Sequence, residues 1–131
     1  MGDGAILRVG DRTSIFDSDA MGGLAELAKA AEIPVQRCLM SGGTCEATAY
    51  QLYGYRCGAM CVALGNYHNC GPEERIEAEF VSIDDVRGLV RLCVEAARCI
   101  EVPGAANDAL RNRLEKRAGE YAGRFAPGVL T

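Results

Sequence analysis

His68 and the cysteines near it are the residues of this chain whose types are suited to metal binding. His68 is the only histidine, and it lies in the stretch ALGNYHNC, which ends at Cys70. Imidazole and thiolate groups are typical zinc ligands, so one interpretation is a structural zinc site formed by Cys57, Cys61, His68 and Cys70. The C-x3-C and H-x-C spacings differ from the usual C-x2-C arrangement. A hydrogen-bonded loop histidine is the simpler interpretation.

The cysteine content points in the same direction. There are seven cysteines, an odd number, and the first residues carry no pattern of an export signal. The apolar share of 49% is enough to form a core without cross-links. We therefore expect most of these cysteines to be reduced and to pack as small apolar side chains in a cytoplasmic protein.

A second candidate site is the stretch SGGT at residues 41–44, which contains Gly42, Gly43 and Thr44. Between a strand and a helix, such a turn can bring backbone N–H groups close to an anion or a substrate carbonyl. The alternative is an ordinary tight turn in which glycine supplies the backbone conformation.

A third cluster, Arg8, Asp11 and Arg12, follows the first predicted strand. Asp11 is a candidate metal ligand or a partner that orients an arginine, whereas the simpler interpretation is a surface ion pair. The sequence contains no GxSxG, HExxH, Walker-type or GxGxxG pattern.

The elements that would position these residues alternate between strands and helices. Strands are predicted at 5–10, 35–40 and 59–64, with helices after Asp17 and through residues 45–53. The run 59–64 is apolar at every position, which is typical of a central parallel strand. This order predicts an α/β fold, a three-layer sandwich with a largely parallel sheet. The 41–44 turn and the loop with His68 both follow strands and would converge at one sheet edge if those strands are neighbours.

The C-terminal third is predicted to be helical. Ser82 and Asp85 form a capping-box-like start. A helical apolar stripe follows, made up of Val86, Leu89, Val90, Cys93, Val94, Ala97 and Ile100. A charged helix is expected at 107–124, with a thin apolar stripe. We therefore predict one domain at 1–103 and a helical tail at 104–131.

Overall charge and hydropathy exclude several function classes. The net charge of −4 and the pI near 5.0 argue against a nucleic-acid-binding protein. The longest apolar runs are far shorter than the ~20 residues that cross a bilayer, so no membrane partner is expected.

Taken in order, the motifs resemble a known peptidase family. The stretches ILRVGDRTSIFD, IPVQRCLMSGGTCEA, GYRCGAMCVALGNYHNCGP and EAEFVSIDDVRGLVRL resemble the C-terminal part of the catalytic domain of TET-type dinuclear zinc aminopeptidases. This family includes glutamyl and deblocking aminopeptidases and proteins labelled cellulase M. The resemblance covers roughly residues 4 to 100 and implies a zinc-peptidase fold of the phosphorylase/hydrolase-like type.

The resemblance assigns roles to particular residues. It makes His68 the last ligand of a two-zinc site and Gly42, Gly43 and Thr44 a turn that lines the substrate site. Glu79 falls near a family glutamate, at a longer spacing. The family aspartate after Gly-Gly-Thr is Cys45 here.

The resemblance also predicts what this chain alone can do. The other zinc ligands and the catalytic glutamate of the family match no residue here, so we expect a fragment or truncated relative that is inactive alone and holds zinc weakly or not at all. The parent family hydrolyses N-terminal residues from peptides and implies a homo-oligomer. The alternative is a non-catalytic, oligomeric α/β interaction module.

Overall fold

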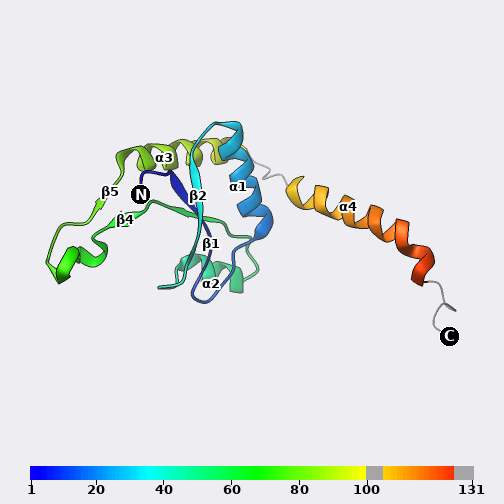
Figure 1. Cartoon of the computed structure of the whole chain (residues 1–131), viewed down its shortest axis with the longest axis horizontal. Helices are drawn as coiled ribbons and strands as arrows, with labels where there is room; N and C mark the ends of the chain where they lie inside the picture. Colours follow the sequence, from blue (N-terminus) through cyan, green and yellow to red (C-terminus); the bar gives the residue numbers. More distant parts are fainter. Residues whose placement is uncertain (100–104, 126–131) are drawn as a thin grey trace.

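The computed structural model describes residues 1–99 and 105–125 of the chain, which form a small α/β unit followed by a separate helix (Figure 1). Its strands are β1 (Ala5–Asp11), β2 (Val35–Met40), β3 (Ala59–Cys61), β4 (Leu64–Gly65) and β5 (Phe80–Val81). Its α-helices are α1 (Ser18–Ala30), α2 (Glu46–Leu52), α3 (Ile83–Arg98) and α4 (Ala105–Tyr121). Short 3-10 turns lie at Tyr67–Asn69, Pro72–Glu74 and Ala122–Phe125.

The main sheet is mixed, with the strand order β2-β1-β3. Strand β2 runs parallel to β1, and β3 runs antiparallel to it. The predicted α/β class is therefore confirmed, whereas a largely parallel three-layer sandwich is not. The predicted central strand 59–64 is wrong in position and direction, because β3 is a short antiparallel strand at the sheet edge. A run of apolar residues predicts burial but does not encode strand direction.

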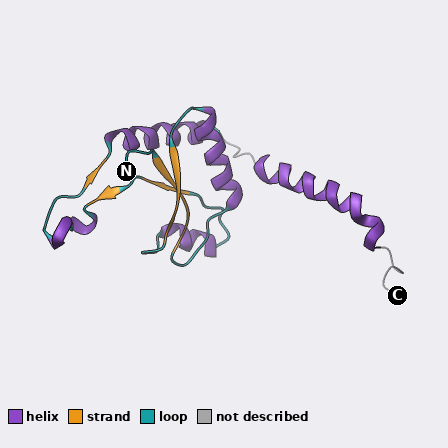
Figure 2. Cartoon of the chain, viewed as in Figure 1, coloured by secondary structure: helices purple, strands orange, loops and turns teal. Residues whose placement is uncertain are grey.

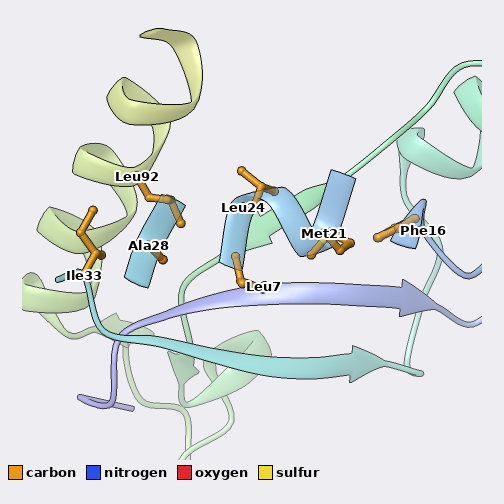
Figure 3. Packing of buried hydrophobic residues seen from close by; sticks show 7 residues of the cluster. All are labelled: Leu7, Phe16, Met21, Leu24, Ala28, Ile33 and Leu92. Atoms are coloured by element: carbon orange, nitrogen blue, oxygen red, sulfur yellow. The ribbon is translucent and has the colours of Figure 1, made fainter. Parts of the chain in front are cut away.

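Helices α1 and α3 pack on the side of the sheet that bears Leu7, which we call the core face (Figures 1 and 3). In the close-up, Leu7 lies beneath α1, and Leu92 of α3 reaches the same cluster. The buried cluster comprises Leu7, Phe16, Met21, Leu24, Ala28, Ile33 and Leu92. Leu7 and Leu92 are both 0% exposed. The core thus joins β1 to both helices.

Helix α1 begins where the sequence predicts. Asp17 is its N-cap, and the carboxylate accepts a hydrogen bond of 2.7 Å from the Ala20 N–H. Arg56 binds the same carboxylate at 2.9 Å and also reaches Asp19 at 3.2 Å. The cap therefore also fixes the segment before β3 to the start of α1.

Helix α3 confirms the predicted cap, but the residues that it buries most deeply do not belong to the apolar stripe. The Ser82 hydroxyl accepts from the Asp85 N–H at 3.3 Å. The residues that α3 buries are Asp85 and Leu92. Val90 and Val94, from the predicted apolar stripe, are 57% and 43% exposed. Ile100 of that stripe and the predicted boundary at 103/104 lie outside the described residues.

Asp85 of α3 binds the N-terminal segment of the chain. Its carboxylate accepts hydrogen bonds from the backbone N–H groups of Gly2, at 2.8 Å, and Gly4, at 2.9 Å. Gly4 has φ +101°, and a Cβ there would lie 2.1 Å from the Pro34 carbonyl oxygen. Only glycine suits this position, which brings the N-terminal segment against the start of β2.

The second sheet is a small antiparallel pair, β4-β5, at the stem of the loop that contains His68. It projects away from the main sheet, as does α4 at the other end of the molecule (Figure 2). Gly65 pairs with Phe80 across this ladder, and a Cβ on Gly65 would lie 2.4 Å from the Phe80 ring. The ring therefore occupies the space that a side chain at position 65 would need.

Candidate functional site

A pocket of about 490 Å³ lies on the side of the sheet opposite the core. Ile6 and Arg8 line it from β1, and they alternate with the core residue Leu7. We call this side, which also bears the ladder partners Cys38 and Cys61, the pocket face. The remaining walls come from Met40, residues 42–45, residues 62–64 and Tyr67.

All three residues of the predicted glycine turn, Gly42, Gly43 and Thr44, line this pocket. They lie between β2 and the short helix α2, as the sequence indicates. A Cβ on either glycine would meet nothing within 4 Å, so no side chain packs over this part of the backbone. The turn thus presents bare main chain beside the pocket.

The two turns that were expected to converge do so in a different way. Because β3 is antiparallel to β1, its carboxyl end lies at the opposite end of the sheet from that of β2. The segments that follow, 42–45 and 62–67, nevertheless contribute to the same pocket across the pocket face. The predicted proximity therefore holds for these segments, but not through a shared sheet edge.

Asp11 lies directly behind the glycine turn and is only 4% exposed. One carboxylate oxygen, Oδ1, accepts from the backbone N–H groups of Thr13 and Ser14, both at 2.9 Å. The other, Oδ2, accepts from the Cys45 N–H at 3.1 Å and from the Thr48 hydroxyl at 2.8 Å. The carboxylate therefore bridges the loop after β1 and the start of α2.

These bonds set the charge state of Asp11. Burial alone would raise its pKa, but the hydrogen bonds from Thr13, Thr48, Cys45 and Ser14 outweigh burial and hold the pKa well below its usual range. The interpretation of Asp11 as part of a surface ion pair is wrong. The sequence signal was the D-x-T-S pattern, in which an aspartate binds backbone two and three residues ahead.

Arg8 is the charged residue that lines the pocket. Its Nε is buried and has no hydrogen-bond partner in the described part of the chain. Its Cζ lies 5.8 Å from the centroid of the Phe16 ring, within the range of a cation–π contact. Sequence reasoning placed Arg8 in a surface cluster with Asp11, because strand alternation alone does not reveal a pocket.

His68 lies next to the pocket rather than in its lining. It is exposed, and its ring stacks on Tyr67, which does line the pocket, with ring centroids 4.0 Å apart. Its backbone is left-handed, with φ 59°, and its N–H donates to Glu79 Oε1 at 2.7 Å. Asn69 Oδ1 in turn accepts from the Glu79 N–H at 3.3 Å. Glu79 thus fixes the backbone of the histidine loop.

The described residues do not form a complete metal site. Among residues 1–99 and 105–125, no group of three or more His, Cys, Asp or Glu side chains is placed to hold a metal ion. A protein zinc site takes three or four such ligands. Neither the Cys57, Cys61, His68 and Cys70 set nor His68 with its neighbours therefore fits a zinc ion by itself.

The family comparison matches this arrangement of motifs. The profile of the M42 glutamyl aminopeptidases matches residues 1–92. The chain belongs to the M42 glutamyl aminopeptidase family. This confirms the resemblance found in the sequence. No curated protein matches the chain.

Solved structures of several aminopeptidases have a similar fold. A TET aminopeptidase from a marine sediment Thaumarchaeota archaeon superposes with a TM-score of 0.64 at 22% identity, covering 82% of this chain and 29% of that chain. The TET1 peptidase of Pyrococcus horikoshii gives 0.59 at 23% identity, covering 74% and 27%. An aminopeptidase from Desulfurococcus kamchatkensis gives 0.60 at 21% identity, covering 72% and 26%. The M42 chain described here therefore spans less than a third of the length of these proteins.

No helix in the described residues has the length and apolar character needed to cross a membrane.

Proposed function

We propose that this chain forms the C-terminal part of the catalytic domain of a zinc-dependent aminopeptidase, and that it contributes one wall of the substrate site. The observation that carries this proposal is the pocket, which joins the 42–44 turn to the segment that leads to His68. Membership of the M42 family and the coverage of 29% of a TET aminopeptidase support it.

In this proposal, His68 is one ligand of a zinc site whose other ligands come from another part of the complete peptidase. The exposed ring and the fixed loop backbone suit that role, because the ring is accessible and its attachment point is held by Glu79. Bound zinc would supply Lewis-acid activation of water and of the peptide carbonyl. The part of the chain that the structure describes lacks the ligand set by itself, so we expect no peptidase activity from the isolated chain.

The substrate class we propose is a peptide with an acidic N-terminal residue. The matching family is named for a glutamyl aminopeptidase, and Arg8 lines an otherwise largely apolar pocket. A guanidinium that lines a pocket pairs favourably with a carboxylate such as that of a glutamyl side chain.

The isolated chain provides the first test. Glutamyl- and leucyl-p-nitroanilide hydrolysis should stay at background with or without added zinc. Because His68 is the only histidine, its imidazole C–H resonances report directly on metal contact. Titration with Zn²⁺ should shift them only at millimolar concentrations, as expected of a single ligand. Chelator-sensitive hydrolysis by the purified chain would overturn the claim that it is inactive alone.

A chimera tests the role in catalysis. Residues 1–99 would replace the matching segment of the Thaumarchaeota TET aminopeptidase. We expect zinc-dependent peptidase activity that His68→Ala reduces at least a hundredfold. Cys70→Ser, in the same loop, is the matched control and should retain activity. An active chimera whose activity survives His68→Ala would show that His68 is not a ligand.

The same chimera tests the proposed preference for peptides with an acidic N-terminal residue. Arg8→Met should lower kcat/KM for a glutamyl substrate at least tenfold and leave that for a leucyl substrate within about threefold, since a methionine keeps the bulk but loses the charge. Equal losses on both substrates would contradict a role for Arg8 in recognising acidic residues.

A second candidate, a non-catalytic oligomeric module, is favoured by the outward side of α3, where Val90 and Val94 are exposed. The Pyrococcus horikoshii relative assembles into a tetrahedron or a large octahedral shell. Sedimentation of the isolated chain would decide this point. Homo-oligomers that dissociate on Val90→Asp would support self-association through α3, and a monomer would count against it.

A further inference from the structure

Asp11 is the buried carboxylate that contacts the wall of the pocket. In the described part of the chain two aspartates are buried, Asp11 and Asp85. Asp85 binds Gly2 and Gly4, and none of these three residues lines the pocket. Asp11 instead binds Cys45, which directly follows the 42–44 turn and itself lines the pocket.

The bonds from Asp11 cross a long separation in sequence. Those to Cys45 and Thr48 span 34 and 37 residues. Three further bonds join the same segments: from the Arg12 N–H to the Gly43 carbonyl at 3.0 Å, between the Thr13 and Thr44 hydroxyls at 3.1 Å, and between the Ser14 and Thr48 hydroxyls at 2.7 Å. The residues after β1 therefore contact the turn and the start of α2 together, and Asp11 makes its bonds from a buried position.

Side-chain packing does not hold the two glycines in place. Apart from the neighbouring residues of the chain, no heavy atom lies within 4 Å of where a Cβ of Gly42 or Gly43 would be. Cys45 packs partly against the core cluster, whereas Gly43 and Thr44 are held by hydrogen bonds. An ionised carboxylate can accept at both oxygens, and Asp11 uses one oxygen for each segment.

We infer that Asp11 is the positioning residue of the 42–44 turn, and that its carboxylate holds the bare main chain of Gly42 and Gly43 at the edge of the pocket. The consequence for peptide binding rests on the proposed function, whereas the positioning itself does not. Asp11 acts through Cys45 and Thr48 and does not line the pocket itself.

Amide hydrogen exchange of the full 131-residue chain, followed by NMR, tests the positioning role. Asp11→Asn retains the shape but places an amide N–H₂ where one oxygen accepts, so the chain loses either the Cys45 bond or the Thr13 and Ser14 bonds. We expect exchange at Cys45 to become at least tenfold faster and the resonances of residues 42–44 to shift. Amides of the core face, such as Leu7, should change less than twofold.

The matched control is Asp85→Asn, which alters the other buried aspartate. It should affect Gly2 and Gly4 and leave residues 42–45 unchanged. A uniform increase in exchange across the chain for Asp11→Asn, or unchanged exchange at Cys45 together with unchanged resonances of residues 42–44, would overturn the inference.

Thr48→Val provides a second test of the positioning role if the Asp11→Asn variant does not fold. It removes the hydroxyl bonds to Oδ2 and to the Ser14 hydroxyl, and it leaves the charge of Asp11 intact. Resonance changes that include residues 42–45 would support the inference, and changes confined to position 48 and its helix would contradict it.

The peptidase chimera separates this inference from the proposed function. If both hold, Asp11→Asn raises KM at least fivefold with a smaller change in kcat, because the turn contacts bound substrate. If the exchange results are as expected but KM is unchanged, Asp11 still positions the turn, and the substrate role of that turn is wrong.

Discussion

The two faces of the main sheet differ in what stabilises them. The core face is apolar and closed by α1 and α3, and Leu7 and Leu92 are fully buried there. The pocket face carries Arg8, Cys38 and Cys61 beside bare main chain, and hydrogen bonds from Asp11 hold its wall. One face thus specifies the fold by packing, and the other specifies a site by polar contacts.

This difference shows how the two roles are divided along a single strand. Successive residues of β1 point to opposite sides, so Leu7 serves the core while Ile6 and Arg8 line the pocket. Changes on the core face should therefore act on global stability. Changes on the pocket face should act on local structure and reactivity.

The largest stability effect is expected from Leu92→Ala on α3. Leu92 is 0% exposed and belongs to the core cluster, so its truncation should lower the free energy of unfolding by about 2–5 kcal/mol. Val94→Ala, on the outward side of the same helix, should cost about 0.5 kcal/mol or less. Urea denaturation of both variants measures the difference, and similar losses would show that the outward side is also packed.

A smaller effect is expected from Asp85→Asn. The change weakens the acceptor for the N–H groups of Gly2 and Gly4 and should cost about 1–3 kcal/mol. Asp84→Asn is the natural control, because Asp84 pairs with the exposed Arg87 and the loss of this surface ion pair should cost about 0.5 kcal/mol or less. Thermal or urea unfolding of the two variants would reveal the contrast. Equal losses in the two variants would mean that the Asp85 hydrogen bonds to Gly2 and Gly4 contribute little to stability.

Acid should lower the free energy of unfolding, because the Asp17 carboxylate that caps α1 becomes protonated. The hydrogen bond and charge of Arg56, with the Ala20 N–H, lower the pKa of Asp17 from its ordinary value of 3.8. The folded chain therefore stays ionised there at lower pH than the unfolded chain. Stability from this group is full above about pH 4 and is lost as the pH falls through the folded pKa.

Unfolding free energies measured between pH 6 and pH 2 should show this loss. Asp17→Asn should reduce the slope below pH 4, since it removes the titrating group but leaves Asp11 in place. An unchanged slope would mean that Asp17 contributes equally in the folded and unfolded states.

The two cysteines of the pocket face, Cys38 and Cys61, should differ in their reactivity toward alkylating reagents. Burial, together with the nearby Cys38, raises the pKa of Cys61, although Arg8 opposes the rise. Cys38 is exposed. Iodoacetamide at pH 8 should therefore label Cys38 at least tenfold faster than Cys61, as followed by peptide mass spectrometry. Faster labelling of Cys61 would indicate that Arg8 controls that thiol instead.

The parts of the fold that depend on local patterns could be predicted. The Asp17 and Ser82 caps, the helices behind them and the strands around Leu7 and Leu39 follow from residue types within a few positions. Residue types also indicated the glycine turn and His68, to which the family resemblance gave roles. The turn does line a pocket, whereas the ligand role of His68 stays a prediction.

The parts that depend on long-range contacts could not be predicted. The apolar run 59–64 contained no information on direction, and its strand pairs antiparallel at an edge. Nothing near Asp11 in sequence indicates its bonds to Cys45 and Thr48. The outward apolar side of α3 shows the same limit, because periodicity identifies a stripe but not the surface that it faces.

The contact between Gly65 and Phe80 has a consequence for how the sequence of the histidine loop can vary among homologues. Because the Phe80 ring fills the space beside Gly65, a larger residue at 65 is acceptable only with a smaller one at 80. The two positions flank the whole loop that carries His68 and Glu79. Among close homologues they should therefore vary together, and the loop between them should tolerate insertions, since the ladder at its base fixes where it begins and ends.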